Sequence, residues 1–202
     1  MVKEKRYFTG AVLIGGKSRR FGTDKVVCPV AEKPMAKKVI ELVSRIFDGV
    51  ILIGHPRKEL NDYKIIEDIV PDRGSLGGIF TALSVAKGEY VFVFGADMPF
   101  LNVELIKYMI TVTDKHDIII PRWSKGIEPL HAVYRKSLIP NIKSLIEKDY
   151  LKISTLIEMK DISTLEITEE KIRSFGDPEK IFFNVNTPDD FKCLISTSKY
   201  NS

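Results

Sequence analysis

The sequence predicts an α/β fold, in which a mainly parallel central sheet carries helices on both faces. Short apolar runs alternate along the chain with amphipathic segments of helical period, and only short links separate them. This alternation favours right-handed strand–helix–strand units, which place their strands in parallel. Because 202 residues with 44% hydrophobic and 29% charged side chains have an ordinary globular composition, we expect a single domain over residues 1–202.

The first half of the chain shows the alternation most clearly. Pro34 suits a first helical turn and opens an amphipathic helix that Gly49 ends, and Gly88 ends another helix. Asn102 is a plausible N-cap for the helix that follows it. The remaining predicted elements are strands at residues 9–15, 50–53, 64–66 and 90–94, and helices at residues 76–87 and 103–112.

The second half of the chain is less regular. Pro140 can be accommodated in a helix only within the first turn. The pattern predicts strands at residues 117–120, 128–134 and 161–167, a turn at residues 122–126, and helices at residues 137–148, 153–159 and 188–195.

Charge, cysteines and hydropathy exclude several classes of protein. A net charge of +4 with a pI near 8.9 is too small and too dispersed to indicate nucleic-acid binding, although it suits anionic small substrates. Cys28 and Cys193 lie far apart and in no metal or redox spacing, which favours two free thiols. The first ten residues lack an apolar signal core and no apolar run reaches membrane-spanning length, so we expect a cytoplasmic protein.

Residues 11–25, AVLIGGKSRRFGTDK, contain the strongest functional signal. Two glycines follow an apolar strand, where they let the backbone turn sharply and bring its N–H groups close to a ligand. The cationic side chains of Arg19, Arg20 and Lys25 lie in the same loop. This combination predicts a polyphosphate site, and the alternative is a glycine turn followed by a solvated basic loop.

Two common phosphate-binding motifs do not fit this loop. A Walker loop requires G-x-x-x-x-G-K-[ST], and although Gly16-Lys17-Ser18 provides its end, Ala11 stands where the first glycine is required. The dinucleotide fingerprint G-x-G-x-x-G is absent as well. The pattern that is present reads G-G-x-x-x-R-x-G-x-D-K.

This pattern resembles the N-terminal signature of α/β nucleotidyltransferases, and most closely that of the molybdenum cofactor guanylyltransferases. Ile14 and Phe21 replace the usual Ala and Met of the family but keep their apolar character. The resemblance spans nearly the whole chain and implies a single-domain, Rossmann-like nucleotidyltransferase fold. It continues in a second glycine segment at 74–78 with Ser75 in place of the usual Pro, a strand-end D-x-P at 97–99, and N-V-N-T-P at 184–188.

Asp97 is the predicted metal ligand. It follows the apolar run 90–94, and the carboxyl ends of parallel strands face the ligand crevice of such a sheet. Mg²⁺ bound to nucleotides commonly takes one or two protein carboxylates together with phosphate oxygens and water. Asp97 also resembles the metal-binding Asp of the family, which makes Mg²⁺ the expected cofactor. The alternative is that Asp97 caps the next helix or closes a turn.

The resemblance also implies which residues bind the nucleotide. Asp68 matches an acidic family position that contacts the nucleotide, and a carboxylate can accept hydrogen bonds from the N–H groups of guanine, although it can equally be solvated. Lys25, Arg19 and Asp97 are the expected catalytic residues. The expected GTP-binding set is Leu13, Ile14, Gly15, Gly16, Lys25, Asp68, Gly77, Gly78 and Asp97.

Asn184 and Asn186 are the expected acceptor-binding residues. On an extended segment they share one face, with Val185 on the other. Thr187, which precedes a proline, can instead serve as the N-cap of the closing helix. Whether His131 and Trp123 contact the acceptor stays open at this point, because a single histidine near a strand and a loop aromatic both have structural explanations.

The resemblance implies transfer of GMP from GTP to the phosphate of molybdopterin carrying molybdenum, with release of pyrophosphate. A related transferase that uses CTP or another acceptor, such as a sugar phosphate, is the alternative within the enzyme class, and a nucleotide-binding accessory protein without turnover lies outside that class. GTP and molybdopterin are the expected partners, and cofactor-insertion proteins or molybdoenzymes are candidate protein partners. A monomer or weak oligomer is expected, with no nucleic acid and no membrane.

Overall fold

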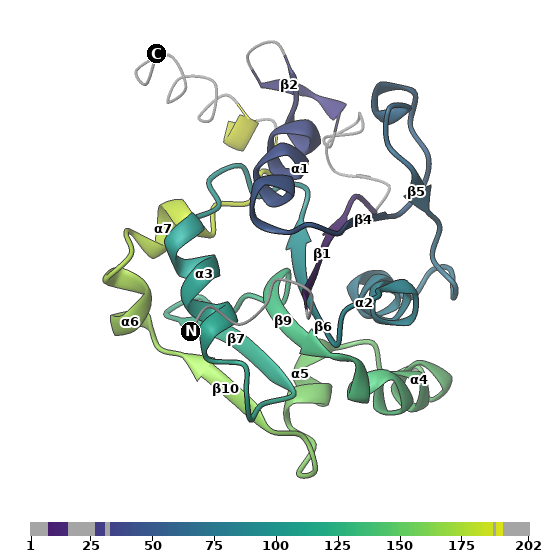
Figure 1. Ribbon diagram of the computed structural model, residues 1–202, viewed down its shortest axis with the longest axis vertical. Helices are drawn as coiled ribbons and strands as arrows, with labels where there is room; N and C mark the ends of the chain where they lie inside the picture. Colours follow the sequence, from purple (N-terminus) through teal and green to yellow (C-terminus); the bar gives the residue numbers. More distant parts are fainter. Residues whose placement is uncertain (1–7, 16–26, 31–32, 188, 192–202) are drawn as a thin grey trace.

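The computed structural model describes residues 8–15, 27–30, 33–187 and 189–191 (Figure 1). Within these residues one eight-stranded sheet runs through the molecule in the order β10-β7-β9-β6-β1-β4-β5, with β8 paired to β7. A separate short pair joins β2 to β3. The strands are β1 (Phe8–Leu13), β2 (Pro29–Val30), β3 (Lys33–Pro34), β4 (Val50–Ile53), β5 (Ile65–Ile66), β6 (Tyr90–Gly95), β7 (Ile118–Trp123), β8 (Gly126–Ile127), β9 (His131–Arg135) and β10 (Thr164–Ile167).

The sheet is mixed, and most of its strands run in the same direction. Strand β1 pairs in parallel with both β6 and β4, and β4 pairs in parallel with β5. Strand β10 pairs in parallel with β7. Strand β9 lies antiparallel between β6 and β7. The link from β7 to β9 is too short for a parallel crossover, which needs a dozen or more residues. The prediction of a mainly parallel sheet is therefore confirmed, with one reversed strand beside β6.

Helices cover both faces of the sheet, as the sequence predicts. Residues of α1, α3, α6 and α7 pack in one hydrophobic cluster, and residues of α2, α4 and α5 pack in the other. Figure 1 shows α1 and α3 on the opposite side of the sheet from α2 and α4. The helices are α1 (Met35–Ile46), α2 (Gly74–Val85), α3 (Val103–Thr111), α4 (Ile139–Glu147), α5 (Ile153–Ile157), α6 (Glu169–Arg173) and α7 (Pro178–Ile181), with 3-10 turns η3 (Lys58–Leu60) and η4 (Lys136–Leu138).

Strand β6 shows why the central strands are apolar without interruption. Phe92 and Phe94 point into the cluster that contains α1, and Val91 and Val93 point into the cluster that contains α2. The two phenylalanine rings stack with their centroids 4.4 Å apart. Because both faces are covered, every position of the strand is buried and no polar alternation appears in the sequence.

Several predicted boundaries are wrong. Arg122 and Trp123 belong to β7 and are not part of a turn, and α2 begins at Gly74, ahead of the predicted start at residue 76. Helices α6 and α7 were not predicted, although Thr168 and Asp177 cap them through side-chain hydrogen bonds. Of the predicted closing helix at residues 188–195, residues 189–191 are helical and the other positions lie outside the described residues.

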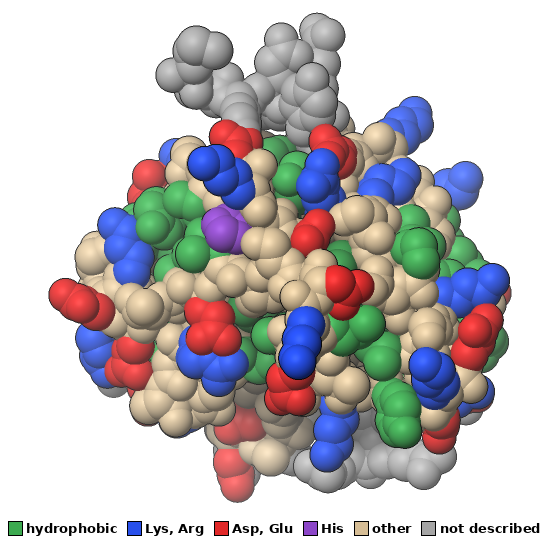
Figure 2. All heavy atoms as spheres, turned by 90° about the horizontal axis from the view of Figure 1, so that it is seen from below, with side chains coloured by type: hydrophobic (Ala, Val, Ile, Leu, Met, Phe, Trp, Pro, Cys, Tyr) green, Lys and Arg blue, Asp and Glu red, His purple; other side chains and the backbone are tan. Residues whose placement is uncertain are grey.

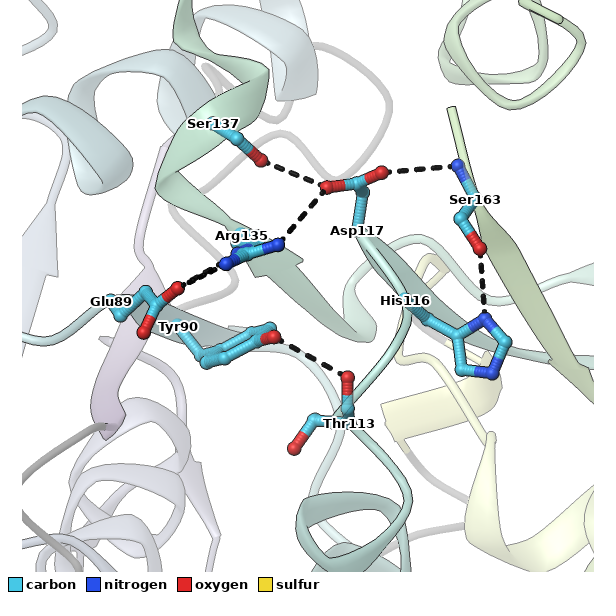
Figure 3. A network of polar contacts seen from close by, with 8 residues as sticks. All are labelled: Glu89, Tyr90, Thr113, His116, Asp117, Arg135, Ser137 and Ser163. Carbon is cyan, nitrogen blue, oxygen red and sulfur yellow. Dashed lines mark hydrogen bonds and ion pairs between the residues drawn. The ribbon is translucent and has the colours of Figure 1, made fainter. Parts of the chain in front are cut away.

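An extended polar network lies at the end of the sheet opposite the carboxyl ends of β1, β4 and β6 (Figure 3). The Asp117 carboxylate accepts hydrogen bonds from the Ser137 hydroxyl at 2.9 Å and the Ser163 N–H at 3.1 Å. Arg135 donates two hydrogen bonds to Glu89, at 2.8 and 2.6 Å. These contacts tie the beginnings of β6, β7 and β10 to the end of β9, so the network stabilises the sheet away from the strand ends where ligands bind.

The face shown in Figure 2 has interspersed acidic and basic side chains. Among the described side chains visible there, positive charge does not gather into a continuous patch, which agrees with the small net charge of +4. None of the helices in the described part of the chain combines the length and the apolar character needed to cross a bilayer.

His131 is a structural residue in the core. It lies fully buried on β9, edge-on to the rings of Phe92, Phe94 and Phe182 at centroid separations of 5.4, 5.8 and 5.4 Å. Neither ring nitrogen has a hydrogen-bond partner among the described residues. Burial lowers the pKa of His131 to about 3, so the imidazole is neutral in the folded protein. A contact between His131 and an acceptor is therefore excluded by its burial.

We expect His131→Phe to make the protein less sensitive to acid. The unfolded chain binds a proton at this residue near pH 6.5, whereas the folded chain does so only near pH 3, so stability falls as the pH drops below 6.5. At pH 5 this residue alone costs about 2 kcal/mol of the free energy of unfolding. Urea unfolding of wild type and variant at pH 7 and pH 5 measures the difference.

Exposed His55 provides the matched control, because His55→Gln also removes one imidazole but leaves His131 in place. The control should retain the acid sensitivity of the wild type. Parallel loss of stability in wild type and His131→Phe between pH 7 and pH 5 would contradict the burial argument.

Candidate active site at the carboxyl ends of the strands

The described residues of the nucleotide set lie together at the carboxyl edge of the sheet. The Leu13 carbonyl, at the end of β1, accepts a hydrogen bond from the Ala96 N–H at 3.1 Å, just beyond β6. Ile14 donates to the Ile53 carbonyl at 2.8 Å, at the end of β4. Gly15 is exposed directly after these buried residues. The strand ends that carry Gly15 and Asp97 are thus direct neighbours, as parallel pairing predicts.

Gly54 packs closely against the backbone of the glycine turn that begins at Gly15. Its φ of +141° lies in a region that L side chains rarely adopt, and its N–H donates to the Ile66 carbonyl at 2.9 Å. A Cβ at this position would lie 3.0 Å from the Gly15 nitrogen and 3.0 Å from the Ile14 carbonyl carbon. This close approach of Gly54 to the Ile14–Gly15 peptide is a tertiary feature that the sequence alone does not reveal.

We expect Gly54→Ala to displace the Ile14–Gly15 peptide and to strain the backbone, at a cost of about 1–3 kcal/mol in the free energy of unfolding. Nucleotide affinity should fall as well, because this peptide leads into residues 16–25, for which the sequence predicts a polyphosphate site. Gly126→Ala is the matched control, since Gly126 has a φ of +112° but no atom within 4 Å of its Cβ position. Calorimetric titration of both variants with GTP would show equal affinities if only backbone strain mattered.

Asp97 lies two residues beyond β6 and is partly exposed. Its Oδ1 would be only 2.6 Å from a Cβ placed on Gly95, so the carboxylate folds back over a position that must remain glycine. The Asp97 carbonyl accepts a hydrogen bond from the Val185 N–H at 3.0 Å. Asp97, the predicted metal ligand, is therefore adjacent in space to the segment predicted to bind the acceptor, although that segment begins 87 positions later, at residue 184.

The segment from Asn184 to Asn186, which is predicted to bind the acceptor, has the alternation of buried and outward side chains that the sequence predicts. Val185 is fully buried, Asn184 is partly buried and Asn186 is exposed, so the two asparagines lie away from the core. Asn184 donates from Nδ2 to the Phe182 carbonyl at 3.0 Å. The Thr187 hydroxyl accepts from the Asp190 N–H at 3.2 Å, which confirms the capping role considered for Thr187.

The second glycine segment is helical. Gly77 and Gly78 lie inside the first turns of α2 and are buried, and a Cβ on Gly78 would lie 2.9 Å from Leu13 Cδ1. The helix therefore approaches β1 closely and directs its first turns toward the carboxyl edge. The helix was expected from residue 76, and the structure extends it back to Gly74, so the whole glycine segment is helical. Buried glycines permit close packing inside a helix as well as in a turn.

Asp68 lies beyond β5, close to α2. Its Oδ1 is 3.5 Å from the Thr81 hydroxyl, which also accepts a hydrogen bond from the Ile69 N–H at 3.0 Å. Burial raises the pKa of Asp68, while His55 and Thr81 act in the opposite direction. Thr81 thus fixes the segment that carries Asp68 on the β5 side of the carboxyl edge.

Gly16, Arg19 and Lys25 lie outside the described residues. Their roles, and the convergence of Lys25 with Asp97 over one triphosphate, stay predictions. Among residues 8–15, 27–30, 33–187 and 189–191, no three His, Cys, Asp or Glu side chains gather as a cation site.

Two residues near the site have positions that the sequence did not reveal. Trp123 is buried, with 8% of its surface exposed, so it is not an exposed loop aromatic. Its indole N–H donates to Glu128 Oε1 at 2.7 Å. Burial first, and then the negative charge of Asp97, raises the pKa of Glu128. No motif singled out this glutamate, and its proximity to Asp97 depends on the β6–β9 pairing.

Comparison with known proteins agrees with this geometry. The family model described as the MobA-like NTP transferase domain matches residues 10–164. A probable molybdenum cofactor guanylyltransferase from Natranaerobius thermophilus is 38% identical over 192 residues, which cover 91% of this chain and 93% of that protein. One from Methanosarcina mazei is 33% identical over 213 residues, covering 98% and 94%.

A solved structure shows the same architecture. The molybdopterin-guanine dinucleotide biosynthesis protein A from Archaeoglobus fulgidus superposes with a TM-score of 0.82 at 28% identity, covering 95% of this chain and 99% of that one. The sequence match, the shared fold and the arrangement of Asp97 beside the glycine turn agree with one another. The chain therefore belongs to the MobA-like NTP transferase family, the family of the molybdenum cofactor guanylyltransferases, and it is a nucleotidyltransferase.

Proposed function

We propose that this nucleotidyltransferase transfers GMP from GTP to the phosphate of molybdopterin carrying molybdenum, and releases pyrophosphate. The names of the relatives support the general role. The observation that carries the proposal is the hydrogen bond from the Val185 N–H to the Asp97 carbonyl at 3.0 Å. It joins the strand end expected at the α-phosphate to the segment expected at the acceptor, so donor and acceptor groups can meet at one place.

The transfer needs positioning and charge neutralisation more than proton transfer. An oxygen of the acceptor phosphate attacks the α-phosphorus of GTP, and the bond from that phosphorus to the bridging oxygen of pyrophosphate breaks. Since the acceptor phosphate is already an anion, no general base is required. Preorganised contacts to the phosphates can account for catalysis in phosphoryl-type transfer.

Asp97 has the chemistry of a Mg²⁺ ligand in this proposal. Its carboxylate oxygen is of the type that Mg²⁺ prefers, and the absence of a Cβ on Gly95 leaves room for it. Asn184 and Asn186 add amide oxygens on the neighbouring segment. When bound, the ion would neutralise negative charge on the phosphates. Asp97 would hold this ion beside the α-phosphate, and the Gly15 and Gly16 amides, Arg19 and Lys25 are proposed to hold the leaving phosphates.

Asp68 is the proposed contact to guanine. It lies on the β5 flank of the carboxyl edge, beside the first turns of α2 that contain Gly77 and Gly78. An ionised carboxylate accepts hydrogen bonds from the N–H donors of guanine, whereas cytosine offers only its amino group. The direction of this preference favours GTP over CTP as the donor.

Pyrophosphate release, measured with each nucleoside triphosphate in the presence and absence of molybdopterin, tests the proposal. We expect release with GTP and Mg²⁺ only when molybdopterin is present, and little release after chelation of the metal. Release with CTP in place of GTP would overturn the assignment of the donor. Release that requires a sugar phosphate in place of molybdopterin would overturn the assignment of the acceptor.

A further inference from the structure

Glu128 is a partly buried carboxylate at the carboxyl edge of the sheet that the proposed mechanism does not use. One of its oxygens, Oε1, accepts the indole N–H of Trp123 at 2.7 Å. Trp123 itself is fixed by burial and by contact with Phe182, whose ring centroid lies 5.8 Å away. The carboxylate of Glu128 is therefore held in one orientation by an immobile donor.

The backbone around Glu128 is equally constrained. The Glu128 N–H donates to the Pro121 carbonyl at 3.0 Å, and the Glu128 carbonyl accepts from the His131 N–H at 3.0 Å. The Tyr134 hydroxyl donates to the Pro129 carbonyl at 2.9 Å. A polar side chain placed on such a rigid segment is preorganised for recognition, because little freedom is lost when it binds a ligand.

This segment passes beside Asp97. The Gly95 N–H donates to the Leu130 carbonyl at 2.9 Å, and the Leu130 Cβ lies 3.5 Å from the Cβ position of Gly95, which is itself 2.6 Å from Asp97 Oδ1. In the sheet order, β9 and β4–β5 lie on opposite sides of β6. Glu128 is therefore on the flank of Asp97 opposite to Asp68, away from the proposed guanine contact.

The second oxygen of Glu128 has no hydrogen-bond partner among the described residues, and it is not sealed in the core. A carboxylate in this state can accept further N–H or O–H donors from a ligand. A 2-amino-4-oxopyrimidine ring edge presents two such N–H donors side by side. Both a pterin and guanine carry this edge, and the position of Glu128 on the flank away from Asp68 favours the pterin.

We propose that Glu128 recognises the 2-amino-4-oxopyrimidine edge of the acceptor, and that Trp123 orients it for this contact. The inference rests on the proposed function for the identity of the acceptor. It assigns acceptor specificity to the β9 flank of the site, in addition to the asparagines expected to bind the acceptor. Glu128→Gln should weaken this recognition, because the amide replaces one acceptor oxygen with a donor.

Kinetics separate this role from a structural one. Glu128→Gln should raise KM for molybdopterin about tenfold, the effect expected for a lost hydrogen bond to a charged group, while KM for GTP changes less than about twofold. Glu128→Asp, which keeps the charge, should lie between wild type and Glu128→Gln. Glu104→Gln is the matched control, since Glu104 is an exposed residue of α3 paired with Lys107.

Tryptophan fluorescence gives a second readout that does not require turnover. Trp123 is the only tryptophan in the chain and it contacts Glu128 directly, so a ligand on this carboxylate should change its emission. We expect a saturable response to molybdopterin in wild type and Glu104→Gln, with about tenfold weaker binding in Glu128→Gln. GTP should give no comparable response.

The outcomes distinguish this inference from the proposed function. If wild type shows no transfer from GTP but binds molybdopterin in a Glu128-dependent way, the proposed function fails and the inference stands. Unchanged molybdopterin affinity and KM in both Glu128 variants would overturn the inference while leaving the function intact. The inference would also be overturned if the Glu128 variants raised KM for GTP and not KM for molybdopterin. The absence of any fluorescence response to molybdopterin in folded wild type would overturn it as well. Thermal unfolding confirms that each variant is folded.

Discussion

Asp97→Ala should remove most of the turnover, by about 10²–10³-fold in kcat, while the protein stays folded. The carboxylate is partly exposed at the end of β6, so its removal leaves no cavity in the core. What is lost is the negative oxygen proposed to hold Mg²⁺ against the phosphates. Asp97→Asn keeps the shape of the side chain but not its charge, and should lose activity almost as severely. Pyrophosphate release at saturating GTP and Mg²⁺ measures both variants.

Asp62→Ala is the matched control, because Asp62 is an exposed carboxylate whose ion pair with Lys37 lies on the protein surface. It should retain the turnover of the wild type. Asp97 variants that released pyrophosphate at nearly the wild-type rate, with unchanged dependence on Mg²⁺, would show that this carboxylate is not the metal ligand. The backbone hydrogen bond from Val185 should persist in every variant, since it involves only the Asp97 carbonyl.

Gly95→Ala should have the second largest effect, although glycine 95 has no side chain to contribute. A Cβ there would meet Asp97 Oδ1 at 2.6 Å, Met98 Cγ at 3.4 Å and Leu130 Cβ at 3.5 Å. The carboxylate is the polar, partly exposed neighbour, so it is the group that must move. Because a displacement of about 1 Å in a positioned group can cost about 10²-fold in rate, we expect a loss of that order in kcat.

Gly49→Ala is the control for Gly95→Ala, since no atom lies within 4 Å of its Cβ position. It should leave both rate and stability close to those of the wild type. The apparent affinity of Gly95→Ala for Mg²⁺ should also fall, which a metal titration of pyrophosphate release would detect. Full activity in Gly95→Ala would mean that Asp97 works equally well from a different position, and would refute its proposed placement.

The sequence was sufficient to predict the parallel half of the sheet. Strands β1 and β6 are buried along their whole length and β4 is half-buried or buried, so all three appear as mainly apolar runs with glycine at or just beyond their ends. The start of α2 was placed at residue 76 instead of residue 74 because Gly74 is a poor helix former. The close approach of this helix to Leu13, which Gly78 permits, is a tertiary feature. Helices α6 and α7 are five and four residues long, which is too short for a periodic pattern to emerge.

Those parts of the candidate site that carry local sequence motifs could be predicted, whereas those that depend on tertiary contacts could not. Asp97 and the segment from Asn184 to Asn186 carry local motifs, and their adjacency follows the expected fold. Gly54 and Gly95 matter because a Cβ at either position would collide with neighbouring atoms. Those neighbours are brought together only by folding, so the sequence does not reveal them. Glu128 reaches the site because β9 runs antiparallel beside β6, and that reversal could not be predicted from residues 128–134 alone.

The hydrogen bond between Val185 and Asp97 has a consequence for biosynthesis on the ribosome. The glycine turn and Asp97 are translated well before Val185, whose N–H is the partner of the Asp97 carbonyl. A nascent or prematurely terminated chain that ends before residue 184 therefore has the strand ends proposed to bind the donor but lacks the segment proposed to bind the acceptor. If the proposed assignment holds, such truncated products cannot carry out group transfer, because transfer would require residues 184–186 to be present.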